Sequence, residues 1–176
     1  LEEAFGEWLG SPHVVALSSC TAALHIALEL VNVRHQCVIV PALTFSGTVH
    51  PILQAGARPI FVDVDATGGI DVVQVDSVLT DMGGIIEAIL PVHLHGSPCR
   101  MDALLAISHR FGVPIIEDVC QAPGAKEHGM MMGALGKIGC FSMSSSKPFT
   151  GGQGGLLVTR DEALARRARR LRQYGE

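Results

Sequence analysis

The sequence lacks the cysteine and histidine spacings that are typical of a disulfide framework or a zinc site. Five cysteines are present, an odd number, and no two of them form a Cys-x-x-Cys pair. They are Cys20, Cys37, Cys99, Cys120 and Cys140. His93 and His95 would share one face of a strand, but no third ligand accompanies them, so we expect no metal site. Unpaired cysteines are typical of a reducing compartment, which predicts a cytoplasmic protein.

Long apolar runs, a positive net charge and nucleotide-binding signatures are also missing. No apolar run reaches the ~18 residues of a membrane span. The net charge of −4 argues against attraction to nucleic acid or anionic membranes. Six of the 13 basic residues are arginines at 160–172, which we interpret as a solvated helix rather than a nucleic-acid surface. Neither G-x-G-x-x-G nor G-K-[ST] occurs, which argues against a dinucleotide or P-loop site.

The length and the two ends predict one large piece of a domain. With 176 residues, 48% of them hydrophobic, the chain can bury a sizeable core. Leu1, Phe5 and Leu9 have helical spacing, so the chain opens within a helix rather than a signal peptide. The last helical pattern continues to Tyr174 with no element after it. We therefore expect residues 1–176 to be one domain, or one large piece of a domain, truncated at both ends.

Apolar, β-branched runs alternate with helical patterns along the chain. We predict seven strands, at 13–17, 36–40, 58–62, 85–92, 113–116, 138–143 and 155–158. We predict helices at 21–31, 48–55, 71–79, 101–111 and 161–174. This alternation predicts an α/β fold with three αβα layers and a mostly parallel seven-stranded sheet. A loop joins the last two strands, which allows one of them to run antiparallel.

Polar side chains follow the strands at the edge where a parallel sheet binds ligands. The segment 18–22 (SSCTA) opens a helix, whose free N–H groups either cradle a phosphate or are simply capped by serine. Asp118 ends an apolar strand, where a carboxylate needs a cationic ligand, an ion pair or a helix to cap. Gln121 would bind the same ligand or cap the same turn. Glu117 would point the opposite way, toward a helix or solvent.

Lys147 is the amine that this edge offers. The other two lysines, Lys126 and Lys137, lie in polar connections and are expected to be solvated. Lys147 follows serines at 142 and 144–146 and precedes glycines at 151, 152, 154 and 155. Such a segment is either a flexible surface loop or a backbone that approaches a phosphate closely. In the second case the lysine amine is available for Schiff-base chemistry.

Five segments match, in order, the motifs of one known family. Segment 19–24 (SCTAAL) is similar to S-G-T-A-A-L, and 41–48 (PALTFSGT) to P-x-x-T-F-x-A-T. Segment 91–96 (PVHLHG) is similar to P-V-H-L-Y-G, and 115–122 (IIEDVCQA) to V-I-E-D-A-A-Q-A. Segment 139–155 (GCFSMSSSKPFTGGQGG) is similar to G-x-F-S-F-x-x-x-K-x-x-x-x-G-E-G-G. The sequence therefore resembles the DegT-type family of sugar aminotransferases, which are fold-type-I pyridoxal-phosphate enzymes.

The resemblance implies a site for pyridoxal 5′-phosphate. Lys147 would hold the cofactor covalently as a Schiff base. Asp118 would pair with the pyridine nitrogen and keep it protonated. Phe45 would stack on the ring, and Gln121 would lie near its phenolic oxygen.

The resemblance also implies a phosphate site, made by Ser142 and the backbone of Thr21 and Ala22. In that turn Cys20 replaces the usual glycine. Gly47, Pro123, Met143 and Gln153 also differ from the usual residues of the family.

The activity that the resemblance implies is transfer of an amino group from glutamate or glutamine to a nucleotide-linked keto-sugar or a keto-cyclitol. The enzyme would be a homodimer, and the family's smaller C-terminal domain would be absent. One alternative is a sugar dehydratase on the same scaffold. Such relatives replace the lysine with histidine, so Lys147 argues against it. Another alternative is a cofactor-binding module or truncated product without turnover.

Overall fold

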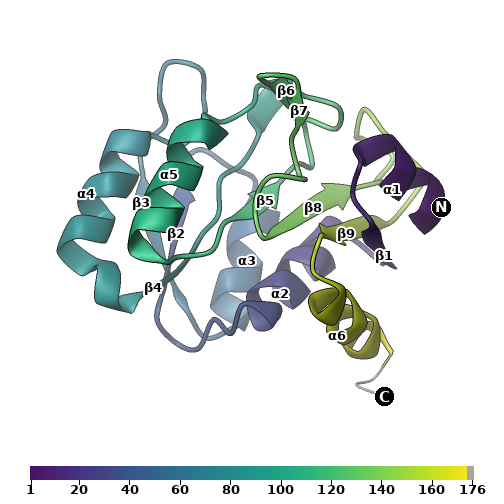
Figure 1. Cartoon of the computed structure of the whole chain (residues 1–176), viewed down its shortest axis with the longest axis horizontal. Helices are drawn as coiled ribbons and strands as arrows, with labels where there is room; N and C mark the ends of the chain where they lie inside the picture. Colours follow the sequence, from purple (N-terminus) through teal and green to yellow (C-terminus); the bar gives the residue numbers. More distant parts are fainter. Residues whose placement is uncertain (174–176) are drawn as a thin grey trace.

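The computed structural model describes residues 1–173, in which helices alternate with strands (Figure 1). The α-helices are α1 (Glu2–Leu9), α2 (Cys20–Leu30), α3 (Ser46–Gln54), α4 (Val72–Met82), α5 (Met101–Phe111) and α6 (Glu162–Arg172). Two 3-10 helices are η1 (Gly83–Ile85) and η2 (Leu94–Gly96). The strands are β1 (His13–Leu17), β2 (Cys37–Pro41), β3 (Arg58–Val62), β4 (Ile86–Ile89), β5 (Ile116–Asp118), β6 (Lys126–Glu127), β7 (Met130–Met131), β8 (Ile138–Ser142) and β9 (Gly155–Thr159).

Seven of these strands form the predicted mixed sheet. Hydrogen bonding orders four of them β1-β9-β8-β5 and three of them β3-β2-β4. Two parallel bridges, Ile89 to Ile115 and Val92 to Asp118, join the two groups between β4 and β5. Strand β9 runs antiparallel to both of its neighbours, and the other pairs are parallel. The predicted fold class is therefore confirmed, and β9 is the antiparallel strand that the sequence allowed.

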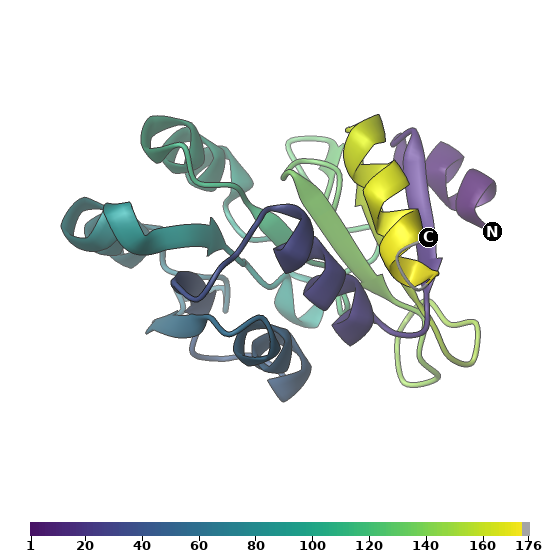
Figure 2. The same cartoon turned by 90° about the horizontal axis from the view of Figure 1, so that it is seen from below.

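Helices cover both faces of the sheet, because successive side chains of a strand point to opposite faces. On β2, Ile39 belongs to one apolar cluster with side chains of α1, α4 and α5. Its neighbour Val40 belongs to the other cluster, with side chains of α2, α3 and α6. The two groups of helices are visible in Figure 1, and Figure 2 shows them from below. The three αβα layers follow directly from strands that are apolar on both faces.

Two helices begin at aspartates that the sequence placed at their start. Asp71 caps α4 by accepting hydrogen bonds from the N–H groups of Val73 and Gln74. Asp161 caps α6 in the same way. A carboxylate at this position satisfies N–H groups that lack a partner within the helix and opposes the helix dipole favourably.

Several boundaries differ from the sequence-based expectation. Strand β5 lies at 116–118 rather than 113–116, and α3 begins two residues earlier than predicted. The small β6–β7 hairpin was not predicted, because two-residue strands carry no periodic pattern. Helix α6 ends at Arg172, and the predicted continuation to Tyr174 falls outside the described residues. Within residues 1–173, no helix has both the length and the apolar character needed to cross a bilayer.

Candidate active site

The carboxyl ends of the parallel strands surround a cavity of about 270 Å³. Six of the seven residues proposed from the sequence line it: Thr21, Phe45, Asp118, Gln121, Ser142 and Lys147. The seventh, Ala22, lies one residue further into α2. A larger and more open groove of about 650 Å³ lies between α1 and Arg169, away from these strand ends. The cavity at the strand ends is the one in which the sheet brings the chemical groups together.

The turn before α2 is capped and still offers N–H groups to the cavity. Ser19 is the N-cap, and its hydroxyl accepts a hydrogen bond from the N–H of Ala22 at 3.1 Å. Serine capping, one of the two interpretations of segment 18–22, is therefore present in the structure. The N–H groups of Cys20 and Thr21 also belong to the first turn, where the helix itself provides no acceptor. A phosphate at this end of α2 would meet both of them and the positive end of the helix dipole.

One of the glycines after Lys147 allows β9 to pack against this turn. A β-carbon at Gly155 would overlap the backbone of Ser19 and Cys20. In the sheet Gly155 pairs with Ser142, the last residue of β8. The absence of a side chain thus lets the Ser142 strand end approach the α2 turn closely. Ser142 is buried, and its hydroxyl oxygen accepts a 3.3 Å hydrogen bond from the Ser144 N–H, which leaves its O–H free to donate into the cavity.

The Asp118 carboxylate is buried and held by two hydrogen bonds. Its side chain is 3% exposed. The Thr48 hydroxyl donates to Oδ2 at 2.8 Å, and the Cys120 N–H donates to Oδ1 at 3.0 Å. Thr44 and Thr48 have their hydroxyl oxygens 2.8 Å apart, so Thr44 donates to Thr48, whose own proton points to Asp118. These two donors fix the orientation of the carboxylate and leave it lone pairs for a cationic group in the cavity.

Lys147 and Phe45 lie on opposite sides of the same space. The Lys147 Nζ is 5.9 Å from the centre of the Phe45 ring. Phe45 is 68% exposed at the start of α3. A β-carbon at Gly47 would lie 2.9 Å from the ring atom Cδ1 of Phe45 and 3.1 Å from Oγ1 of Thr21. Glycine at this position, where the family motif has alanine, therefore leaves room for the ring beside the α2 turn.

The segment around Lys147 is shaped by hydrogen bonds. The Lys147 N–H donates to the Ser144 carbonyl at 3.0 Å, and the Gly151 N–H donates to the Met143 carbonyl at 3.0 Å. The Thr150 hydroxyl donates to the same Met143 carbonyl. These bonds favour an ordered turn over the flexible-loop alternative. By contrast Lys126 and Lys137 are exposed, as expected, and Lys137 forms an ion pair with Asp161.

Gln121 presents its amide nitrogen to the cavity. Its Oε1 accepts a 3.2 Å hydrogen bond from the N–H of His95, so its NH₂ group is the free end. His95 is exposed and has a positive φ of 53° in η2, whereas His93 is fully buried. The two histidines therefore do not share one strand face, and that expectation was wrong.

Glu117 points away from the cavity and was misjudged from the sequence. It reaches neither solvent nor a helix, because its side chain is fully buried. Its carboxylate accepts hydrogen bonds from the N–H groups of Gly133, Leu135 and Gly136, at 2.6–2.9 Å. The His93 Nδ1 accepts from the Cys99 N–H, so its Nε2 carries the proton and donates to Glu117 at 3.1 Å. This network holds β5, and with it Asp118, against the turn at 133–136.

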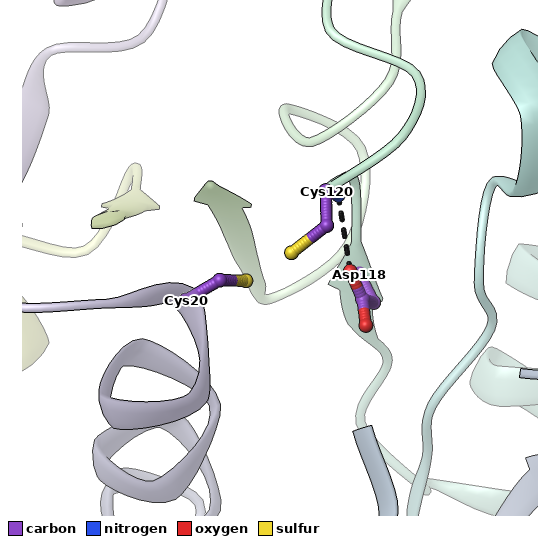
Figure 3. Close-up of side chains that lie close together, drawn as sticks. All are labelled: Cys20, Asp118 and Cys120. Atoms are coloured by element: carbon purple, nitrogen blue, oxygen red, sulfur yellow. Dashed lines mark hydrogen bonds between the residues drawn. The ribbon is translucent and has the colours of Figure 1, made fainter. Parts of the chain in front are cut away.

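Cys20 and Cys120 meet beside Asp118, which the sequence did not indicate. Their two sulfur atoms and the carboxylate oxygen all lie within 4.8 Å of one another. Figure 3 shows the two thiols pointing toward each other, one from the start of α2 and one from the turn after β5. A separation of one hundred positions in the chain hides this contact from any local pattern.

Comparison with known proteins identifies the family. The DegT/DnrJ/EryC1/StrS aminotransferase family matches residues 1–176, and the chain belongs to this family. It is 41% identical over 175 residues to the L-glutamine:2-deoxy-scyllo-inosose aminotransferase of Streptomyces paromomycinus, covering 98% of this chain and 41% of that protein. It is 36% identical over 176 residues to the GDP-perosamine synthase of Caulobacter vibrioides, covering 99% of this chain and 47% of that protein. The chain thus spans about half the length of the curated relatives it matches.

Solved structures share the fold. A DegT DnrJ EryC1 StrS aminotransferase from Brucella abortus superposes with a TM-score of 0.91 at 35% identity, over 96% of this chain and 47% of that one. A GDP-4-keto-6-deoxymannose-3-dehydratase with a trapped PLP-glutamate geminal diamine superposes with a TM-score of 0.92 at 31% identity, over 99% of this chain and 46% of that one. The predicted family and fold class are confirmed, and the dehydratase structure contains the predicted cofactor, pyridoxal 5′-phosphate.

Proposed function

We propose that this chain carries the cofactor site of an aminotransferase. The donor is glutamate or glutamine, and the acceptor is a nucleotide-linked keto-sugar or a keto-cyclitol. The observation that supports this most strongly is the meeting of Asp118, Phe45 and Lys147 around one cavity at the strand ends. The named relatives include an aminotransferase for a keto-cyclitol and a synthase for a GDP-linked amino sugar.

The residues of the cavity fit pyridoxal 5′-phosphate in charge and shape. Asp118 supplies a buried carboxylate for a pyridinium nitrogen. The α2 turn and the Ser142 hydroxyl supply donors for a phosphate. Phe45 supplies a flat apolar surface for an aromatic ring. When bound, the cofactor supplies an electron sink for the carbon that gains or loses the amine.

Each side chain then has a defined task. Lys147 would hold the cofactor through Nζ, and its amine, when free, would move a proton at the substrate carbon as general acid and base. Asp118 would pair with the pyridine nitrogen through a carboxylate that the Thr48 hydroxyl and the Cys120 N–H hold in place. Phe45 covers one side of the ring and excludes water from it. The amide NH₂ of Gln121 donates toward the phenolic oxygen.

The cavity needs further protein around it to hold a sugar substrate. Phe45 and Leu43 beside it are 68% and 51% exposed. We propose that a second copy of the chain, together with a smaller C-terminal domain, covers this edge in the complete homodimeric enzyme. The five free thiols support a reducing, cytoplasmic location.

A sugar dehydratase is the second candidate, since one structural neighbour has that activity. Lys147 argues against this activity, because the family resemblance implies that sugar dehydratases on the same scaffold have histidine in place of the lysine. Screening amino donors and keto-sugars separates the two, since a transaminase returns an amino sugar and a dehydratase a deoxy sugar. In a third outcome the chain binds the cofactor but turns over neither class of substrate. That result would indicate a cofactor-binding module without turnover.

Borohydride reduction in the presence of pyridoxal phosphate tests the assignment of Lys147. We expect a visible absorption band that glutamate or glutamine bleaches, and a reduced adduct that peptide mapping locates at Lys147. Lys147→Ala should abolish the adduct and leave the circular dichroism unchanged, whereas the exposed control Lys137→Ala should retain it. An adduct at Lys126 or Lys137 would show that the assignment is wrong.

A further inference from the structure

The cysteine pair beside Asp118 has no task in the proposed transamination. Cys20 occupies the glycine position of the phosphate turn, and Cys120 stands where the family motif E-D-A-A-Q has its second alanine. These two departures from the motifs come from distant parts of the chain, yet their side chains converge in the structure (Figure 3). Both residues line the cavity, and both are free thiols.

The donor atoms are close enough to share one metal ion. Two sulfur atoms and one carboxylate oxygen lie within 4.8 Å of one another. Zinc binds sulfur at about 2.3 Å, so two sulfurs of one tetrahedral site lie about 3.8 Å apart. Side-chain rotations that shorten the distances between the donor atoms by about 1 Å therefore supply three ligands of a tetrahedral site. Water from the adjoining cavity can be the fourth ligand.

The surroundings orient the oxygen donor and leave the sulfurs reachable. Thr48 and the Cys120 N–H hold the carboxylate of Asp118 in place, as hydrogen-bonded neighbours of metal ligands do. Cys20 is the first residue of α2 and lines the cavity. Cys120 is only partly buried and opens to the cavity.

We propose that Cys20, Cys120 and Asp118 form a binding site for a thiophilic divalent cation of the zinc type, and that the bound cation excludes the cofactor. The first statement goes beyond the proposed function. The second rests on it, because exclusion follows from the use of Asp118 by both ligands. Metal and cofactor then compete for one carboxylate and one phosphate turn.

Binding is coupled to proton release. Burial raises the pKa of the Cys20 thiol to about 12. The hydrogen bond with Cys20, and then burial, raise the pKa of Cys120 above its usual value. Both thiols are thus protonated near neutral pH. One divalent ion, two thiols and one carboxylate give one complex of charge −1 and two protons, so affinity rises about a hundredfold per pH unit below the thiol pKa values.

Cadmium titration of the cofactor-free chain tests the site directly. We expect one cadmium ion per chain and an ultraviolet thiolate-to-cadmium band. Cys20→Gly and Cys120→Ala, which restore the residues of the family motifs, should each abolish the band. The control variants Cys37→Ala and Cys99→Ala change thiols outside the cavity and should retain it. Circular dichroism of every variant checks that the chain has folded.

Two results would overturn the proposal. One is a cadmium band of full strength in the folded Cys20→Gly, Cys120→Ala double variant. The other is a folded, cofactor-free chain that takes up no cadmium. Competition is measured separately: chain saturated with pyridoxal phosphate should take up cadmium at least tenfold more weakly. Cadmium binding with no cofactor binding would contradict only the proposed function, and cofactor binding with no cadmium binding would contradict only the metal site.

Discussion

The Thr48 hydroxyl donates a 2.8 Å hydrogen bond to Oδ2 of Asp118, although the two residues are 70 positions apart. Both side chains are buried, Thr48 on α3 and Asp118 at the end of β5. Thr44 fixes the direction of this bond by donating to Thr48. The orientation of the carboxylate at the cofactor site thus depends on a helix from the other half of the sheet.

Replacing Thr48 with valine should weaken both folding and cofactor binding. The substitution keeps the shape but removes one of the two donors to a buried carboxylate, which costs about 1.5–3 kcal/mol. We expect a lower midpoint of urea unfolding and an affinity for pyridoxal phosphate reduced by about tenfold. Thr80→Val is the matched control, because Thr80 is exposed on α4 and its hydroxyl donates to the Asp76 carbonyl of the same helix. Equal behaviour of the two variants would show that the bond does not hold Asp118.

Asp118→Asn should separate binding from chemistry. The amide can still occupy the space but cannot neutralise a pyridinium, so the cofactor should bind with a shifted absorption band. Single-turnover transamination in the complete enzyme should slow about a hundredfold or more, equivalent to roughly 3 kcal/mol of lost stabilisation. The exposed control Asp102→Asn should react at the normal rate. An unchanged rate in Asp118→Asn would remove this carboxylate from the mechanism.

The layers and the position of the site were predictable from the sequence, because both depend on local patterns. Strands apolar on both faces require helices on both sides, and parallel strands bring their carboxyl ends to one edge. Asp118 ends one strand and Lys147 follows another, so the sheet brings both residues to the same edge. The orientation of β9 was left open, since a loop connection permits either direction.

The partners of Glu117 and Cys20 were not predictable, because they are set by the order of strands across the sheet. Glu117 finds its donors in backbone N–H groups at 133–136, which no side-chain pattern reveals. Cys120 follows β5, which is separated from β9 only by β8. Cys20 lies in the α2 turn that contacts the first residue of β9, so the strand order brings the two cysteines together. Such contacts join residues far apart in sequence.

Glu117→Gln should destabilise the fold more strongly than an exposed substitution. The amide replaces a charged acceptor of four hydrogen bonds and turns NH₂ toward backbone N–H groups that also donate. We expect a loss of about 3–5 kcal/mol in the free energy of unfolding, measured with urea. Glu162→Gln breaks only an exposed pair with Arg166 and should change it by less than about 0.5 kcal/mol. Similar values for both would mean that Glu117 does not hold the 133–136 turn.

Gly155→Ala should damage the phosphate end of the site in particular. The added methyl group overlaps the backbone of Ser19 and Cys20, so the α2 turn and the end of β8 must move apart. Overpacking of this kind costs about 1–3 kcal/mol of stability. We expect the affinity for pyridoxal phosphate, measured by absorption titration, to fall at least tenfold because two of its donors come from that turn. Gly84→Ala is the control, since a β-carbon there meets nothing within 4 Å. A Gly155→Ala chain that binds the cofactor as tightly as Gly84→Ala would place the phosphate elsewhere.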